Sequence, residues 1–279
     1  MTPSTPASEG PSSAPREHAT PHHRVHVTSL AGKAGSTLLL PLAFSSPFRP
    51  DLIQRAVVAE QSHRRQPYGT SPTAGLRHSV YWSGKGKGVA RTPRLMDSMR
   101  GAQAPNTVGG RPTHPPVVDR IWSKKINRKE ARVAFSSALG ATRDPTLAQA
   151  RGHVVPSGIS LPVVLEDPVE GVVTAEAART LLEKLHLWDD VTRSRDGIHV
   201  RGGRGRRRGR VRRTARSVLL VTSAPGKARG FRNLSGVEVV PAQRLGTEDL
   251  APGGAAGRLT LFSVSAVESL RARLGEARP

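Results

Sequence analysis

The stretch between Arg64 and Pro116 constrains the fold of this chain more than any other part of it. It contains nine lysines and arginines against the single acid Asp97, and its apolar residues follow neither the spacing of a helix nor that of a strand. A segment of this length without periodicity inside a compact domain is typical of a functional loop. We therefore expect an extended basic loop over residues 64–116, although a solvated linker would share much of its composition.

The charge of the whole chain indicates what such a loop could meet. The sequence contains 43 lysines and arginines but only 21 aspartates and glutamates, and its formal net charge is +22. A chain this basic repels itself unless an anion neutralises it, and the usual anions are nucleic acid and the membrane surface. The longest apolar run, LLLPLAF at 38–44, is too short to span a bilayer and contains Pro41. The sequence therefore favours nucleic acid and predicts no membrane partner.

The first residues and the lack of cysteine bear on location and chemistry. No basic stretch followed by an apolar core opens the chain, so we expect no secretion. Without cysteine the chain has no disulfide, no thiolate metal site and no cysteine nucleophile, which fits a cytoplasmic protein. His22, His23 and His26 have no carboxylate or cysteine at ligand spacing, so no metal site is predicted there.

The apolar content suffices for one modest core. Only 36% of the residues are hydrophobic and 4% are aromatic, which is too little to pack the whole chain. Residues 1–22 are mostly Pro, Ser, Thr and Ala and predict a disordered tail. Residues 23–279 are expected to form the folded domain.

Apolar strands that alternate with helical segments predict an α/β fold, namely a single globular three-layer domain with a largely parallel sheet. Thr174 is the expected cap of one helix, with Ala177, Leu181 and Leu185 on its buried face. Strands are expected at VHVTSL, STLLLPLAF, ISLPVVLED, SVLLVTS, GVEVVP and LTLFSV, and helices after Pro50, over 124–139, over 174–188 and from Ser265.

Two further segments are strongly basic. The helix over 124–139 places Ile126, Val133, Ala134 and Leu139 beside the bases Lys124, Lys125, Arg128, Lys129 and Arg132. A second, arginine-rich loop over 197–216 contains no acid and nine arginines: Arg201, Arg204, Arg206, Arg207, Arg208, Arg210, Arg212, Arg213 and Arg216. A solvated helix face, a nuclear-targeting cluster and a disordered tail are the alternative interpretations. We favour RNA contact, because arginine can grip a phosphate with two donors and stack on a base.

Known enzyme motifs are incomplete in this chain. GKAGST at 32–37 lacks the earlier glycine of a Walker phosphate loop, and no nucleophile elbow or zinc-protease motif occurs. The glycines of GKGKG do not have dinucleotide-loop spacing, and no clear strand or helix flanks them. The adjacent aspartates of WDD at 188–190 are expected to cap or solvate a helix end. We therefore predict no catalytic residue, no cofactor and no metal.

The basic and aromatic residues define a predicted RNA-binding set. Glycine lets a backbone pass close to phosphate, and aromatic rings stack on unpaired bases. The predicted RNA-binding residues are Arg64, Arg65, Arg77, Trp82, Lys85, Lys87, Arg91, Arg94, Arg100, Arg111, His114, Lys124, Lys125, Arg128, Lys129, Arg201, Arg204, Arg206, Arg207, Arg208, Arg210, Arg212 and Arg213.

Motifs in a fixed order resemble a known family. The runs RRQPYG, AGLRHS, WSGKGKGVARTPR, GAQAPNTVGGRPTHPP, KKINRKEARVAFSSALGAT and ARGH are followed by LPVVLED, LWDDV, RGRRRGRVRR, NLSGVEVV and LAPGGAAGRLTLFSVSAVESL. Together they are similar to the archaeal and eukaryotic form of the large-subunit ribosomal protein L-four family. The resemblance extends from about residue 25 to about residue 275. We expect the archaeal type, because the sequence ends soon after its last expected helix.

The resemblance implies a structural constituent of the large ribosomal subunit, active in translation and not an enzyme. Its implied partners are large-subunit rRNA, several domains of which it would bind early in assembly, neighbouring large-subunit proteins and the nascent polypeptide; it would be a monomer within the ribosome. The long loop would run inward and help to form a constriction of the peptide exit tunnel. Its tip would comprise Tyr81, Trp82, Ser83, Gly84, Lys85, Gly86, Lys87 and Gly88. A free RNA chaperone or a nucleic-acid-binding architectural protein is the alternative function.

Overall fold

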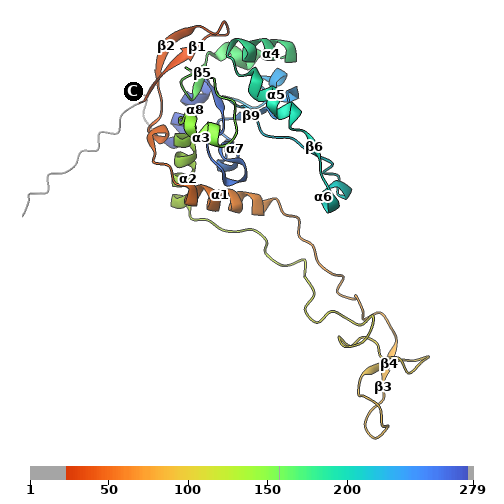
Figure 1. Ribbon diagram of the computed structural model, residues 1–279. Coiled ribbons are helices and arrows are strands. Elements are labelled where there is room, and N and C mark those ends of the chain that lie inside the picture. Colours follow the sequence, from red (N-terminus) through yellow and green to blue (C-terminus); the bar gives the residue numbers. More distant parts are fainter. Residues whose placement is uncertain (1–22, 157, 276–279) are drawn as a thin grey trace, which may run out of the picture. The chain divides into compact units, whose positions relative to one another are not determined.

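The computed structural model describes residues 23–156 and 158–275, so the tail expected over residues 1–22 lies outside the described residues (Figure 1). Contacts within the chain divide it into two compact units. We call the first the core unit; it comprises the chain up to Val57 and from Ile126 onward. We call the second, Val58–Lys125, the extension, and it includes the whole of the loop expected over 64–116.

A six-stranded sheet lies at the centre of the core unit. Its strand order is β2-β1-β5-β10-β8-β9, and every neighbouring pair is parallel except β1 and β2, which form an antiparallel hairpin. The strand bounds are β1 Arg24–Thr28, β2 Ala34–Leu39, β5 Val163–Leu165, β8 Leu219–Thr222, β9 Glu238–Pro241 and β10 Thr260–Ser263. Each strand lies within or beside a run for which a strand was expected.

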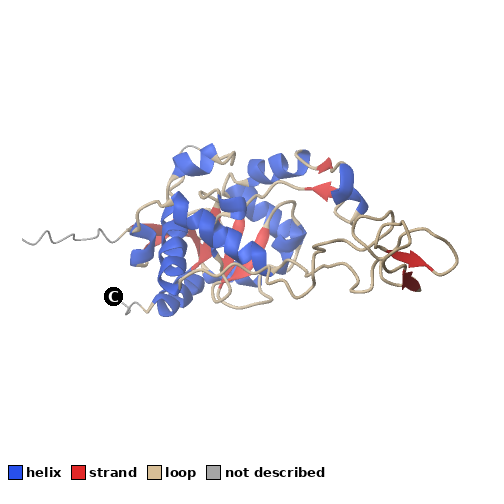
Figure 2. Ribbon diagram, turned by 90° about the horizontal axis from the view of Figure 1, so that it is seen from below, coloured by secondary structure: helices blue, strands red, loops and turns tan. Residues whose placement is uncertain are grey.

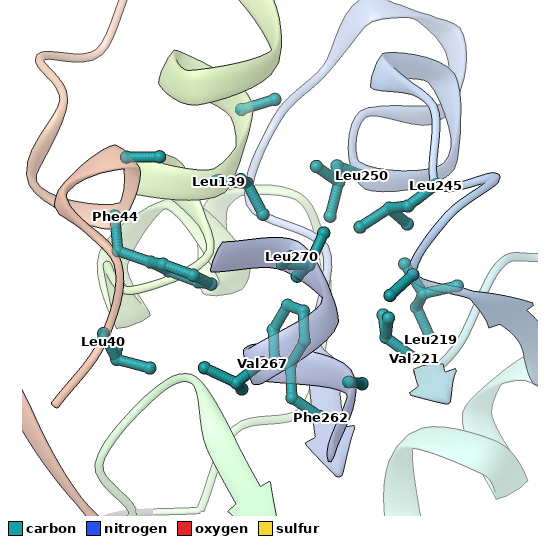
Figure 3. Packing of buried hydrophobic residues seen from close by; sticks show 14 of the residues in the cluster. Leu40, Phe44, Leu139, Leu219, Val221, Leu245, Leu250, Phe262, Val267 and Leu270 are labelled. Atoms are coloured by element: carbon teal, nitrogen blue, oxygen red, sulfur yellow. The ribbon is translucent and has the colours of Figure 1, made fainter. Parts of the chain in front are cut away.

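The central strands have apolar residues on both faces, because helices cover the sheet on both sides. In β8, Leu219 and Val221 point into one hydrophobic cluster and Leu220 into the other. The same alternation places Phe262 of β10 opposite to Leu261. Figure 3 shows the first cluster, in which the rings of Phe44 and Phe262 meet edge to face with centroids 5.5 Å apart. The predicted three-layer α/β fold is therefore confirmed.

The helices divide between the two faces (Figures 1 and 2). The first cluster contains side chains from α1 Pro50–His63, α2 Arg128–Ala141, α7 Thr247–Leu250, α8 Val264–Leu274 and the short 3-10 helix η1 Leu42–Ser45. The second contains side chains from α3 Pro145–Ala150, α4 Ala175–Lys184, α5 Trp188–Asp196 and the 3-10 helices η2 Asp167–Gly171 and η3 Arg229–Asn233. A further 3-10 turn, η4, spans Pro252–Gly254.

Local predictions for these elements were correct in type and less accurate in detail. The Thr174 hydroxyl accepts a hydrogen bond from the Ala177 amide, which confirms the predicted cap of α4. Leu181 and Leu185 are buried as expected, but the alanine that is buried with them is Ala178 and not Ala177. Val133 of α2, one of the apolar residues named beside the basic flank of this helix, is 48% exposed. The end of the expected strand at 36–44 is the helix η1, where Pro41 supplies no amide for the ladder.

Two small antiparallel sheets lie outside the main sheet. In the extension, β3 Val80–Trp82 pairs with β4 Pro93–Leu95. These strands flank GKGKG, where the sequence had shown no clear element. In the core unit, β6 His199–Val200 pairs with β7 Arg212–Arg213, and the short helix α6 Gly203–Arg207 lies between them. We call residues 197–216 the arm.

Candidate nucleic-acid interface

The tip of the β3–β4 hairpin presents lysine and tryptophan on an open backbone. Gly84, Gly86 and Gly88 have φ values of +71°, +78° and +67°, a region in which other residues are strained. A Cβ atom at any of the three would meet nothing within 4 Å, so glycine is needed there for conformation and not for packing. Lys85 and Lys87 between them are exposed. The tip therefore offers two exposed charges without internal partners among the described residues.

Not every predicted tip residue faces outward. The side chain of Trp82 is 67% exposed, whereas Tyr81 is half-buried and its hydroxyl lies 3.2 Å from the sulfur of Met99. The Ser83 hydroxyl is buried, with no hydrogen-bond partner in the described part of the chain. Within the tip set, Trp82 is thus the ring available for stacking.

Arg94 acts as an internal brace of the hairpin. Its guanidinium donates to the carbonyl of Met99 and, at 3.3 Å, to the carbonyl of Ala90. A second brace is Gln103, whose amide donates to the carbonyls of Leu76 at 3.0 Å and His78 at 2.5 Å. Sequence reasoning assigned Arg94 to RNA because a lone arginine in a basic loop carries no sign of the carbonyls it will meet.

A stack of aromatic and cationic side chains joins the two limbs of the extension, which are the segments on either side of the β3–β4 hairpin. We call this stacked region the foot of the extension. The rings of Tyr68 and Trp122 are stacked, with centroids 5.1 Å apart and planes inclined by 24°. The guanidinium carbons of Arg65 and Arg120 lie 4.5 and 4.9 Å from the Trp122 ring centroid. Tyr68, Trp122 and Arg120 were not among the predicted site residues. The aromatic residues on either limb of the loop were the available signal.

The two limbs of the extension also meet through their backbones. The Thr70 amide donates to the Pro116 carbonyl at 2.8 Å, and a Cβ on Gly69 would come within 2.7 Å of the Val118 nitrogen. Beside this crossing lies a groove of about 340 Å³, lined mainly by residues 70–76 and 111–119 and including the Arg111 side chain. The limbs are thus held together at the foot by ring stacking and hydrogen bonds within the chain.

The other predicted bases of the extension and of α2 are exposed. Arg77 bonds locally, donating to the Thr73 hydroxyl at 3.0 Å. The exposed members of the predicted set are Arg64, Arg65, Arg77, Lys85, Lys87, Arg91, Arg100, Arg111, His114, Lys124, Lys125, Arg128 and Lys129.

The arm gathers arginines on a short hairpin with a helical turn. Its two strands are fixed by the pairs His199–Arg213 and Val200–Arg212 and by a hydrogen bond of 2.8 Å from the Arg201 amide to the Val211 carbonyl. Eight arginines are exposed, and none forms an ion pair in the described part of the chain. They are Arg201, Arg204, Arg206, Arg207, Arg208, Arg210, Arg212 and Arg213.

The last residues of the arm, Ala215 and Arg216, form what we call its foot, and they are hydrogen-bonded to the rest of the core unit. Ser194 of α5 donates to the Ala215 carbonyl at 2.6 Å, and Arg193 donates to the Arg216 carbonyl at 2.9 Å. Gly236 lies against the same place, and a Cβ there would overlap Ser194 and Ala215. The ninth arginine, Arg216, differs from the other eight because it pairs with Glu238 of β9.

A buried carboxylate organises the residues around this foot. Asp190 is fully buried and accepts hydrogen bonds from the Ser217 hydroxyl at 2.7 Å, the Val154 amide at 3.0 Å and Arg193 Nε at 3.0 Å. His153 Nδ1 lies 3.1 Å from both of its oxygens. Burial by itself would raise the pKa of Asp190, but these hydrogen bonds and the neighbouring charges lower it to about 2. The expectation that both aspartates of WDD cap or solvate a helix end is therefore wrong for Asp190.

A second buried carboxylate lies near the carboxyl ends of β8 and β10, where α/β proteins commonly bind ligands. Glu170 accepts hydrogen bonds from the Ser223 amide at 2.6 Å and the Ser263 hydroxyl at 2.7 Å, and it pairs with Lys227 at 2.5 Å. Burial opposes ionisation, yet the bonds from Lys227, Ser223 and Ser263 lower the pKa of Glu170 to about 2. The position is thus occupied by the chain's own ion pair.

Two other kinds of site are absent from the residues that the structure describes. Among residues 23–156 and 158–275, no three histidine, aspartate or glutamate side chains are grouped so that they could hold a metal ion. Over the same residues, no helix has the length and apolar character needed to cross a membrane.

The sequence of this chain is similar to those of known proteins over most of its length. The sequence pattern described as the ribosomal protein L4/L1 family matches residues 38–273. A large ribosomal subunit protein uL4 from Haloquadratum walsbyi is 42% identical over 248 residues, covering 88% of this chain and 98% of the relative. The uL4 of Methanopyrus kandleri is 43% identical over 256 residues, covering 90% and 98%. That of Methanothrix thermoacetophila is 43% identical over 249 residues, covering 89% and 98%.

Proposed function

The chain belongs to the ribosomal protein L4/L1 family, and from this premise we propose that it is a structural constituent of the large ribosomal subunit that binds rRNA through the extension and the arm. The observation that carries the proposal is the state of the arm. Its eight exposed arginines have no carboxylate partner in the described part of the chain, on a hairpin whose foot is fastened to the core unit. A dense, unneutralised cationic segment on a fixed base is suited to the phosphate backbone of RNA.

The extension supports the same role in a different way. Its foot is braced by Trp122 and Tyr68, whereas its tip offers Trp82, Lys85 and Lys87 to a partner. We propose that the tip lines part of the nascent-peptide exit tunnel and that the limbs contact rRNA. The protein would then act in early subunit assembly, next to other large-subunit proteins, as a monomer within cytoplasmic ribosomes. Holding two RNA segments with one protein raises the effective concentration of each contact.

The proposal is tested by sedimentation. Lysate of the source cells is separated on a sucrose gradient at high salt, and the chain is followed by mass spectrometry. We expect it to migrate with large subunits at the stoichiometry of their other proteins. Recovery only in light, RNA-free fractions would reject the proposal and favour the free RNA chaperone or architectural protein.

Placement of the tip requires its own measurement. Lys85 and Lys87 are reached by amine-specific crosslinkers, and ribosomes stalled on a defined message supply a nascent chain. We expect crosslinks from these lysines to the nascent chain, with Lys33 in the β1–β2 turn of the core unit as an exposed control that gives none. Crosslinks from Lys33 alone would place the tip outside the tunnel.

A further inference from the structure

A closed network of charged groups lies at the foot of the arm, among residues that no sequence pattern assigned to RNA. Arg193 connects the Asp190 carboxylate to the Arg216 carbonyl. Arg216 pairs with Glu238, which also accepts from Arg258 Nη1 at 2.7 Å. The network then closes, because Arg258 Nε donates to the Ser217 carbonyl at 3.1 Å and the Ser217 hydroxyl donates to Asp190.

Arg258 is the buried cation of this network. Its side chain is fully buried, and burial lowers its pKa despite the attraction of Glu238. Besides Glu238 and Ser217, it donates to the Asp249 carbonyl at 2.8 Å. Its Nη2 is buried and finds no hydrogen-bond partner in the described part of the chain. The donors of the network thus exceed its acceptors.

A fourth arginine, Arg151, lies beside this network, and unlike the other three it has no carboxylate partner in the described part of the chain. Its guanidinium donates to the carbonyls of Pro252, at 3.0 Å, and Ala255, shortly after the Asp249 carbonyl that binds Arg258. It forms no ion pair in the described part of the chain. Burial, followed by the positive charges of Arg258, Arg193 and Arg216, lowers the pKa of Arg151 to about 10. A half-buried cation beside three others is costly unless an anion joins it.

The charges do not balance in the protein alone. Four arginines, Arg151, Arg193, Arg216 and Arg258, face three carboxylates, those of Asp190, Glu238 and Asp249. The side chains of Arg193 and Arg216 remain 30% and 52% exposed, so neither side chain is closed off from solvent. We propose that Arg151, Arg193 and Arg216 form a phosphate-binding site at the foot of the arm.

Phosphate is the anion that suits these groups. Guanidinium forks match its oxygens, and a phosphate supplies both the missing charge and acceptors for several donors. This inference rests on the proposed function, because the phosphate is taken to belong to the RNA that the arm binds. The arm would then contact RNA in two ways. Its eight exposed arginines would bind through their side chains, and its foot would bind one phosphate at a fixed site that sets the register of the bound strand.

The experiment uses the full chain in a background where each of the eight exposed arm arginines is replaced by glutamine, so that inorganic phosphate cannot bind there. The melting temperature is measured as phosphate is added at constant ionic strength. We expect saturating phosphate to raise it by about 2–4 °C, as follows when one ligand stabilises a protein of this size by about 1 kcal/mol. Arg151→Gln should abolish the rise. Arg195→Gln, an exposed change on the same helix as Arg193, should leave it intact.

The outcomes separate this site from the proposed function. An equal rise with and without Arg151 would mean that phosphate only screens the net charge, and the site would be rejected. If Arg151→Gln does not fold, Arg216→Gln gives the same comparison, because that side chain is half exposed. With the native arm, Arg151→Gln should also reduce the salt slope of rRNA binding by about one. Phosphate binding without rRNA binding would retain the site and reject the proposed function. Unchanged rRNA binding with no effect of phosphate would reject the site and retain the proposed function.

Discussion

At the scale of single residues, Asp190 shows how a charged group can be fully buried. Groups of His153, Val154, Arg193 and Ser217 bind one carboxylate, which has no access to water. Its adjacent residue, Asp189, is exposed at the same helix start. The two aspartates therefore have opposite roles despite being neighbours: Asp190 ties α5 to the strands and to the foot of the arm, and Asp189 faces solvent.

Replacing Asp190 tests this role. Asp190→Asn leaves the hydrogen-bonding shape but removes the charge that compensates Arg193, so we expect the free energy of unfolding to fall by roughly 3 kcal/mol. Asp189→Asn should change it by less than about 0.5 kcal/mol. Urea denaturation of both variants and the parent makes the comparison. Equal effects of the two changes would show that burial of Asp190 does not matter.

Acid stability follows from the same carboxylates. The folded-state pKa values of Asp190 and Glu170 are about 2, below the ordinary values of 3.8 and 4.5. Groups with lowered pKa stabilise the fold above their unfolded value, and this stability is lost as the pH falls toward the folded value. We expect each to contribute on the order of 2–3 kcal/mol at neutral pH, lost between about pH 5 and pH 2. When the free energy of unfolding is measured against pH, it should fall less steeply toward acid in Glu170→Gln than in the parent protein.

At the scale of elements, the extension joins a braced foot to an unbraced tip. The stack on Trp122 holds the two limbs together, and the Thr70 amide reports on their contact through its bond to the Pro116 carbonyl. In contrast, Trp82 at the tip is largely exposed. The extension thus has two tryptophans that should differ in whether they stabilise the free protein.

Amide hydrogen exchange of the free protein distinguishes them. Loss of a stacked ring pair and two cation–ring contacts costs about 1–2 kcal/mol locally, so Trp122→Leu should speed exchange at Thr70 roughly tenfold. Trp82→Leu should leave that exchange unchanged and weaken rRNA binding instead. Rapid exchange at Thr70 in the parent protein would mean that the foot forms only with RNA.

The arm offers a second comparison at this scale. Replacing Arg204, Arg206, Arg207 and Arg208 together by glutamine should reduce the salt slope of RNA binding by about 3 and leave the far-UV spectrum unchanged, because exposed charges add little stability. Arg258→Gln removes one buried cation and should instead destabilise the fold by roughly 3 kcal/mol. Loss of helical signal in the fourfold variant would mean that the arm supports the core.

Features that depend on neighbouring residues could be predicted from the sequence. The Thr174 cap and the strand of LTLFSV follow from local pattern, and the resemblance supplied the family. Features made by distant residues could not be predicted. Asp190 meets Ser217 and His153, which are 27 and 37 positions away. For the same reason the inward turn of Arg94 and the pairing of Arg216 with Glu238 carry no signal in an arginine count.

At the scale of the whole molecule, the excess of positive charge sets the response to salt. If the extension and the arm together neutralise about ten rRNA phosphates, the logarithm of the affinity should fall with the logarithm of salt concentration at a slope of about −7 to −9. Filter binding of the purified chain to large-subunit rRNA across a salt series measures this slope. A nearly flat line would show that contacts other than phosphate neutralisation carry the binding.

The position of β10 has a consequence for how the protein is made. This strand lies between β5 and β8, yet it precedes only α8 in the sequence. During synthesis the sheet therefore consists of two unjoined halves until residues 260–263 have been added, and both basic segments emerge before them. Because pairing of distant strands is slow and leaves apolar edges exposed, a growing chain would carry its charged loops into the crowded cell before it has a core. Truncation before Thr260 should yield a polypeptide that depends on chaperones and does not fold by itself.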